Sequence, residues 1–230
     1  MGLDRFEDIG ARFGAAVAAL PGDASVSQNL SEPWDGKCPI VLAVGAPGYR
    51  STHRAIPEGA IFMLCLSRDS MVLETEILVP CPESRLTFHL PPMTNATIQR
   101  MGSSVAFVGD VDGNGHPDLA TAHGYKRGSN EQRVLILRMG SGTGAAGSLV
   151  PTVISTVSLN ESTNEALAAE GTNRFGSAIV AMPSASGGLM NVSTIAVGHS
   201  QAGRGLIWLY HLDSTGIPTQ VVKLGPGDCS

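Results

Sequence analysis

The sequence has few charged residues and no long apolar run. Only 15% of its 230 residues are charged, and 15 basic against 20 acidic side chains give a formal net charge of -5. This balance gives no electrostatic reason to expect nucleic acid as a partner. Because no stretch of about eighteen apolar residues occurs, the sequence predicts no membrane-spanning helix. The low charge also disfavours long surface helices, which are usually rich in Glu, Lys and Arg.

Common metal and export signatures are missing as well. The four cysteines form no CxxC pair and the six histidines form no H-E-x-x-H motif, so zinc is not expected. Residues 1–24 contain only a short apolar run preceded by acidic residues, unlike a signal peptide. The even number of cysteines permits disulfides in an oxidising compartment, and they are Cys38, Cys65, Cys81 and Cys229.

Glycosylation sequons favour such a compartment. The pattern N-x-[ST] occurs four times, where chance predicts roughly one. This excess indicates a secreted or lumenal protein. The candidate acceptors are Asn29, Asn95, Asn160 and Asn191.

What the chain does contain is an internal repeat. Three segments share an Arg, a large apolar residue, a Gly, two small residues and an apolar run, and three more strand-like segments follow each of them. The fourth segment of each unit is the most polar, as an outer strand beside solvent would be. First strands are predicted in 12–20, 100–108 and 174–182, second strands in 40–49, 117–126 and 194–203, third strands from 59, 133 and 205, and fourth strands in 71–78, 151–159 and 219–224.

Units of four strands predict an all-β fold, most simply three blades of a β-propeller. The inner strands of a blade are covered on both faces and therefore read as continuous apolar runs. A β-sandwich with similar strands is the alternative. The predicted organisation is an N-terminal extension (1–11), blades at 12–80, 100–160 and 174–224, linkers at 81–99 and 161–173, and a tail at 225–230.

A glycine repeats near the start of each unit, where it predicts positive φ or close backbone approach. The large apolar residue before it is predicted to wedge between neighbouring blades. These glycines are Gly14, Gly102 and Gly176, preceded by Phe13, Met101 and Phe175.

The units resemble the FG-GAP repeats known from the propeller of integrin α subunits and related extracellular proteins. The first unit carries both halves of that motif, "RFG" at 12–14 and "LAVGAP" at 42–47, while the second departs from it at Met101. The resemblance covers 12–224 and implies a calcium-supported extracellular module; family members form a seven-bladed ring. Because three blades are too few to close a ring, we expect an incomplete one, continued by further blades or covered by another chain.

The second unit contains an acidic loop, "GDVDGNGHPD", at 109–118. Alternate oxygen ligands in a tight loop suit calcium, and FG-GAP repeats use this spacing in a turn between strands. A helical EF-hand would need Glu where Thr121 stands, and a metal-free turn capping backbone N–H groups is the alternative. The equivalent loops of the other units lack alternating carboxylates, so one calcium site is expected. Its predicted ligands are Asp110, Asp112, Asn114, the backbone carbonyl of His116, and Asp118.

Two further features complete the sequence-based predictions. "GHSQA" at 198–202 is similar to a hydrolase nucleophile elbow, but a strand rather than a helix is predicted to follow, so Ser200 is interpreted as a turn residue and no catalytic residue is expected. Trp34, in a long insert, is a candidate partner contact. The favoured function is therefore non-enzymatic recognition of an extracellular protein or glycan in adhesion or matrix assembly. The alternative is an accessory propeller of a surface enzyme such as a phospholipase or glycosidase.

Overall fold

Twelve β-strands make up the described part of the chain in a computed structural model, in the order β1 to β12. Each overlaps one of the segments predicted to be a strand, so the all-β class is confirmed. Structure is described for residues 11–21, 40–50, 57–67, 69, 72–78, 99–114, 116–124, 133–140, 152–160, 175–183, 192–201 and 204–226. The strands are β1 (Ala16–Pro21), β2 (Ile40–Ala46), β3 (Ala60–Leu66), β4 (Val72–Leu78), β5 (Gln99–Gly109), β6 (Asp118–Gly124), β7 (Arg133–Gly140), β8 (Thr152–Asn160), β9 (Phe175–Pro183), β10 (Val192–Gln201), β11 (Arg204–Leu212) and β12 (Pro218–Leu224).

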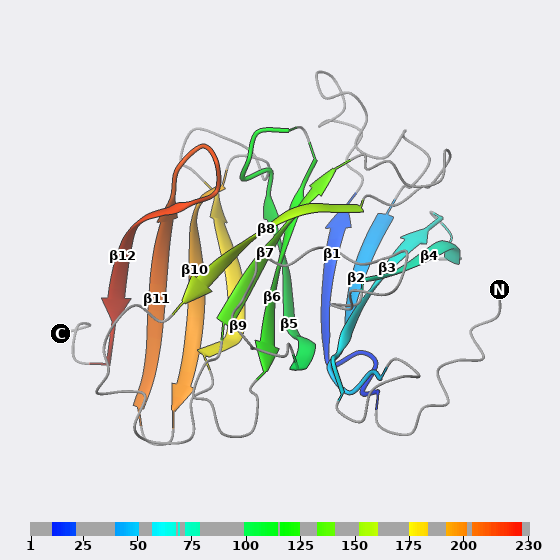
Figure 1. The fold of residues 1–230 in the computed structure, drawn as a ribbon, viewed down its shortest axis with the longest axis horizontal. Helices are drawn as coiled ribbons and strands as arrows, with labels where there is room; N and C mark the ends of the chain where they lie inside the picture. The colour runs from blue at the N-terminus through cyan, green and yellow to red at the C-terminus, as the bar shows by residue number, and fades with distance from the viewer. Residues whose placement is uncertain are drawn as a thin grey trace.

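The strands form three four-stranded antiparallel sheets, one for each repeat unit. Their orders are β1-β2-β3-β4, β5-β6-β7-β8 and β9-β10-β11-β12, so each sheet is a meander in chain order. We call them the first, middle and third sheets. Figure 1 shows them side by side in chain order, from the blue and cyan first sheet to the orange and red third sheet. Among the described residues no helix occurs, and therefore none that could span a membrane.

The middle sheet is covered on both faces. On one face its side chains pack with the first sheet, around Met63, Leu119 and Leu137. On the other face they pack with the third sheet, around Ile136 and Tyr210. This double coverage explains why the second and third strands of the middle unit read as nearly unbroken apolar runs. In contrast, the side chains of β12 are half-buried or exposed, as predicted for an outer strand.

The first strand of each following sheet makes most of the contact with the sheet before it. β5 packs against β1, β2 and β3, and β9 packs against β5, β6 and β7. At these junctions the repeated glycines come close to the preceding sheet. A Cβ atom on Gly102 would lie 2.6 Å from the carbonyl oxygen of Ala60, and one on Gly176 would lie 2.7 Å from the Cβ of Ala122. Only glycine therefore fits at these positions without displacing a neighbour.

The predicted backbone conformation of the repeated glycines is confirmed. Gly14, Gly102 and Gly176 have φ of +86°, +87° and +81°, the left-handed region in which an L side chain is strained. The sequence did not predict that Arg12 and Arg100, two residues before, also have positive φ (53° and 55°). The first and middle units thus begin with the same backbone conformation, in which two residues, separated by one other, both have positive φ. We call this short segment the corner.

The predicted wedge holds for two of the three units. Met101 and Phe175, 0% and 2% exposed, are buried between neighbouring sheets. Phe13 is 44% exposed, and its ring meets the ring of Phe62 at 5.2 Å. The difference has a simple cause, since within the described residues no sheet precedes the first one.

Candidate metal centre

The acidic loop is the turn between β5 and β6 of the middle sheet. β5 ends at Gly109 and β6 begins at Asp118, and these two residues are paired across the strands. Gly109 and Gly113 have positive φ (73° and 74°), which bends the chain back within a few residues. Since β6 follows directly, Thr121 lies within a strand, as expected for a turn between strands rather than for a helical calcium site.

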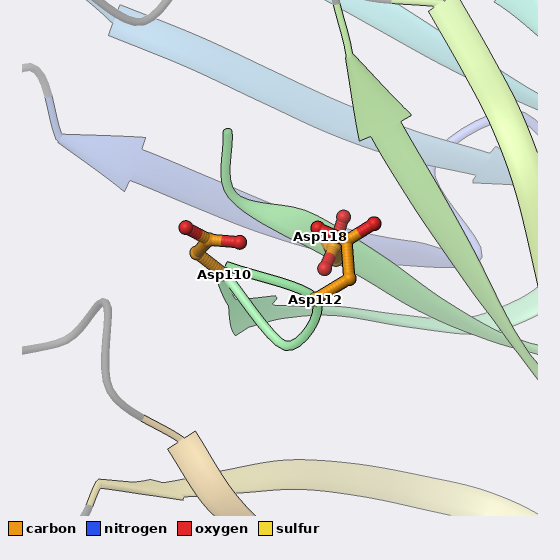
Figure 2. Close-up of side chains that lie close together, drawn as sticks. All are labelled: Asp110, Asp112 and Asp118. Atoms are coloured by element: carbon orange, nitrogen blue, oxygen red, sulfur yellow. The ribbon is translucent and has the colours of Figure 1, made fainter. Parts of the chain in front are cut away.

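Three of the predicted ligands come together in this turn. Asp110, Asp112 and Asp118 each offer a carboxylate oxygen, and these oxygens lie within 4.8 Å of one another. Figure 2 shows the three carboxylates gathered on one side of the turn. Asp110 and Asp112 are half-buried, whereas Asp118 is fully buried. The loop therefore concentrates acidic groups at one point, with one of them beneath the surface.

Asp118 is held rigidly by backbone donors on two elements. The Val111 amide donates to its Oδ2 at 2.9 Å, and the Met139 amide at the end of β7 donates to its Oδ1 at 2.8 Å. Asp118 thus ties the acidic turn to the third strand of the same sheet. These bonds also occupy one lone pair on each oxygen and leave the others for further ligands.

The other two carboxylates shape the turn itself. The backbone amide of Asn114 donates to Oδ1 of Asp110 at 3.0 Å and to Oδ1 of Asp112 at 3.2 Å. Hydrogen bonds of this kind would also cap a metal-free turn. Three acidic groups that converge in this way, one of them buried, could also hold a metal ion.

Asn114, another of the predicted ligands, also makes hydrogen bonds through its side chain. Its side-chain Nδ2 donates to the carbonyl oxygen of Met139 at 2.8 Å, and its Oδ1 accepts from the His116 amide at 2.8 Å. The side chain therefore braces the loop on both sides, and its oxygen keeps a second lone pair for a further ligand. His116 contributes its amide to this brace. Asn114 and the backbone carbonyl of His116 thus stay predicted ligands beside the three carboxylates.

The acidic cluster is electrostatically unfavourable when no cation is bound. The pKa of Asp118 is raised to about 7, mainly by burial and also by the charges of Asp112 and Asp110, against the lowering effect of the Met139 and Val111 amides. Burial also raises the pKa of Asp112, opposed by the hydrogen bond from Asn114 and assisted by the charge of Asp110. A cation at the cluster would remove both penalties.

The cluster fits a hard divalent cation such as calcium. Calcium binds oxygen ligands at about 2.3–2.6 Å, so two oxygens in one coordination shell lie up to about 5 Å apart. The 4.8 Å limit on the three carboxylate oxygens is within this range. If a cation binds, Asp110, Asp112 and Asp118 would hold it, and its charge would offset their mutual repulsion.

The loop also touches the third sheet. A Cβ atom on Gly216, in the turn between β11 and β12, would lie 2.8 Å from Cγ2 of Val111. The Arg138 guanidinium on β7 donates to the carbonyl oxygen of Thr215 in the same turn. Asp213 caps this turn by accepting from the amides of Thr215 and Ile217 at 2.8 and 3.0 Å. We call residues 213–217 the hairpin turn. No feature of the sequence alone indicated that it would meet the acidic loop.

The other residues named from the sequence lie partly inside and partly outside the described residues. Ser200, interpreted as a turn residue, lies inside β10, where it pairs with Gly205 of β11 next to the hairpin connection. The strand predicted to follow it is present as β11. Trp208 and Tyr210 of the following strand β11 are buried. Trp34, Asn29, Asn95 and Asn191 lie outside the described residues, and Asn160 is the last residue of β8.

Comparisons with known proteins do not place the chain. No family profile matches it, and the search of curated proteins returned no match.

Proposed function

We propose that this protein is a calcium-supported β-propeller module of the FG-GAP type that recognises an extracellular protein or glycan in adhesion or matrix assembly. The observation that carries the proposal is the acidic turn. It places three carboxylates within 4.8 Å of one another, between the first two strands of one unit in a chain of repeated four-stranded sheets.

The arrangement of first strands supports propeller geometry over a two-layer sandwich. In a propeller the first strand of every blade lies near a common axis. Residues of β1, β5 and β9 together line a cavity of about 340 Å³, among them Leu20, Phe107 and Ala181. A sandwich of two layers would leave one face of every sheet to solvent, whereas the middle sheet here is covered on both.

Two observations support an extracellular setting. Cys65 on β3 is disulfide-bonded, and structural disulfides persist mainly in oxidising compartments. The excess of glycosylation sequons favours the same compartment. The low net charge gives no support to nucleic acid as a partner.

In this proposal calcium acts as a structural ion. It would neutralise Asp110, Asp112 and Asp118 and fix the turn that joins β5 to β6 and, through Asp118, to Met139. Extracellular modules bind calcium at about 0.1–1 mM, close to its extracellular concentration. The turn would therefore be largely occupied outside cells and empty inside them.

A binding screen tests the proposed recognition. Protein secreted from a eukaryotic host would be applied to arrays of extracellular-matrix proteins and glycans, in calcium and in chelator. We expect binding to a defined set of ligands that weakens when calcium is removed, because the recognition loops are anchored on the calcium-supported sheets. Absence of any ligand from a folded, calcium-loaded sample would overturn the recognition function. Unchanged binding in chelator would overturn the role of calcium in it.

A further inference from the structure

The outer face of the third sheet repeats the surface on which one sheet receives the next. In the first sheet this receiving surface pairs a small residue on the second strand with an aliphatic residue on the third. Ala43 lies beside Met63, and Gly45 beside Ile61. In the middle sheet the equivalent pairs are Ala120 with Ile136 and Ala122 with Val134.

The third sheet carries the same pairs on the face turned away from the middle sheet. Ala196 lies beside Leu209, and Gly198 beside Ile207. The first and fourth strands extend this face with Val180 opposite Ala196 and Leu224 opposite Ile207. Ile207 is 47% exposed, whereas its counterparts Ile61 and Val134 are buried. Val180 is 58% exposed, whereas its counterparts Ala18 and Ala106 are half-buried.

The first strand of the first sheet presents the complementary surface, whereas Val44 and Phe62 on the same face are already buried, 3% and 4% exposed. The alternate residues of its first strand, Phe13, Ala15, Val17 and Ala19, are exposed, and Val17 is 56% exposed. The equivalents of Phe13 and Val17 in the following units pack on the preceding sheet. These are Met101 and Val105 in the middle sheet, and Phe175 and Ile179 in the third.

The corner that leads into β1 is already shaped for docking. Arg12 and Gly14 have φ of 53° and 86°, matching 55° and 87° at Arg100 and Gly102. Gly102 lies against Gly45 and Ala60 of the first sheet, whereas a Cβ atom on Gly14 would meet nothing within 4 Å. The docking corner therefore exists without a surface to dock on among the described residues.

We propose that two copies of this chain associate head to tail, with β1 of one copy packing on the outer face of the third sheet of the other. Gly14 of one copy would lie over Gly198 and Ile207 of its partner, as Gly102 lies over Gly45 and Gly176 lies over Ala122 and Val134. Both surfaces consist of apolar and uncharged side chains at these positions, so no charge is buried by their contact.

The number of sheets favours a second copy as the occupant. The contact is heterologous, because different surfaces of the two copies meet, and such contacts close when a whole number of copies completes a ring. Propellers have about four to eight blades, and the three described sheets of each of two copies would give six. This closure rests on the proposed propeller architecture, whereas the paired surfaces are features of the sheets themselves.

The test is a complementation experiment between two variants, followed by sedimentation velocity over a concentration series. Val17→Arg blocks the docking strand, and Ile207→Arg blocks the receiving face. We expect the wild type to be a dimer and each variant alone to be monomeric. An equimolar mixture of the two variants should form a one-to-one dimer, because one intact pair of surfaces remains. Ile217→Arg, at an exposed position in the hairpin turn, is the matched control and should remain dimeric.

Each other outcome would overturn the proposal. A monomeric wild type excludes a second copy as the occupant, and a dimer of Val17→Arg alone shows that the third sheets pair with each other instead. A mixture that stays monomeric excludes the head-to-tail contact. Circular dichroism establishes that both variants are folded. The calcium-dependent rise in thermal midpoint separates this result from the proposed calcium module, since the rise should persist in a monomer.

Discussion

Replacing Asp112 with Asn should abolish most of the stabilisation by calcium while leaving the metal-free fold intact. Oδ1 of Asp112 accepts a hydrogen bond from the Asn114 amide at 3.2 Å, and the side-chain oxygen of Asn can accept the same bond. The substitution therefore removes one of three converging charges and keeps the turn. Because burial and the neighbouring Asp110 raise the pKa of Asp112, its charged form is disfavoured in the metal-free protein. We expect the variant to be as stable as the wild type in chelator, or slightly more stable.

The expected size of the calcium effect follows from binding linkage. With a dissociation constant of about 0.1–1 mM, calcium at about 10 mM stabilises the wild type by about 1.4–2.7 kcal/mol. In a chain of this length that raises the thermal midpoint by roughly 3–10 °C. Loss of a directly coordinating carboxylate should weaken binding by at least about a hundredfold, since outer-shell changes alone cost up to that much. The variant would then keep less than about 0.5 kcal/mol of the stabilisation.

Differential scanning fluorimetry in chelator and in calcium measures both quantities. Asp213→Asn is the matched control, because Asp213 also caps a short turn but lies in the hairpin turn and outside the cluster. Hydrogen bonds from Thr215 and Ile217 lower the pKa of Asp213, so this control should lose a little stability in both conditions and keep the full calcium increment. If Asp112→Asn kept the wild-type increment, the cation would not bind at this cluster. A wild type indifferent to calcium would refute the site altogether.

Two other predictions concern protonation and backbone packing. The pKa of Asp118 is raised from 3.8 to about 7, so the metal-free fold binds more protons than the unfolded chain between these values. The contribution of Asp118 to the free energy of unfolding should therefore be largest below about pH 4 and fall as pH rises through about 7, by about 4 kcal/mol at most. The stabilisation by calcium should instead grow from about pH 6 to about pH 8. Melting curves at both of these pH values, with and without calcium, check these opposite trends. Gly14→Ala should lower the free energy of unfolding by about 1 kcal/mol, because an L side chain is strained at positive φ. Gly102→Ala should lower it by at least about 2 kcal/mol more, because its Cβ would also lie 2.6 Å from the Ala60 carbonyl oxygen. Urea unfolding at low protein concentration measures the difference, and equal costs would contradict the packing of Gly102 on the first sheet.

The sequence predicted the strands well because short runs of neighbouring residues determine where they form. Continuous apolar runs mark strands covered on both faces, and the repeat supplied three independent copies of the pattern. The repeated glycines predicted positive φ for the same reason, since few other residues tolerate it. The wedge prediction was wrong only for Phe13, where the deciding factor is the neighbouring sheet and not the strand itself.

The acidic residues of the site could be predicted from the sequence, but the hydrogen-bond partners of the loop side chains could not. Alternating Asp residues indicate a ligand loop, but the spacing does not say which side chains are engaged elsewhere. The side chain of Asn114 is hydrogen-bonded to Met139 and His116, and Met139 lies 25 residues further along the chain. Contacts of this kind depend on how strands pair, which a local pattern cannot specify. The positive φ of Arg12 was missed because Arg has no intrinsic preference for that conformation.

The contact between Val111 and Gly216 means that the acidic loop and the third sheet share part of their stability. Val111 donates its amide to Asp118, packs in the core shared with the third sheet, and lies under the hairpin turn. Ordering the loop would therefore suppress local opening of β11 and β12, which contribute no ligand. Amide hydrogen exchange in this hairpin would then slow when the middle sheet is loaded with calcium. A calcium ion bound to the middle sheet would therefore also stabilise the third sheet. A pulling force applied to the end of the third sheet would be resisted in part by this ion.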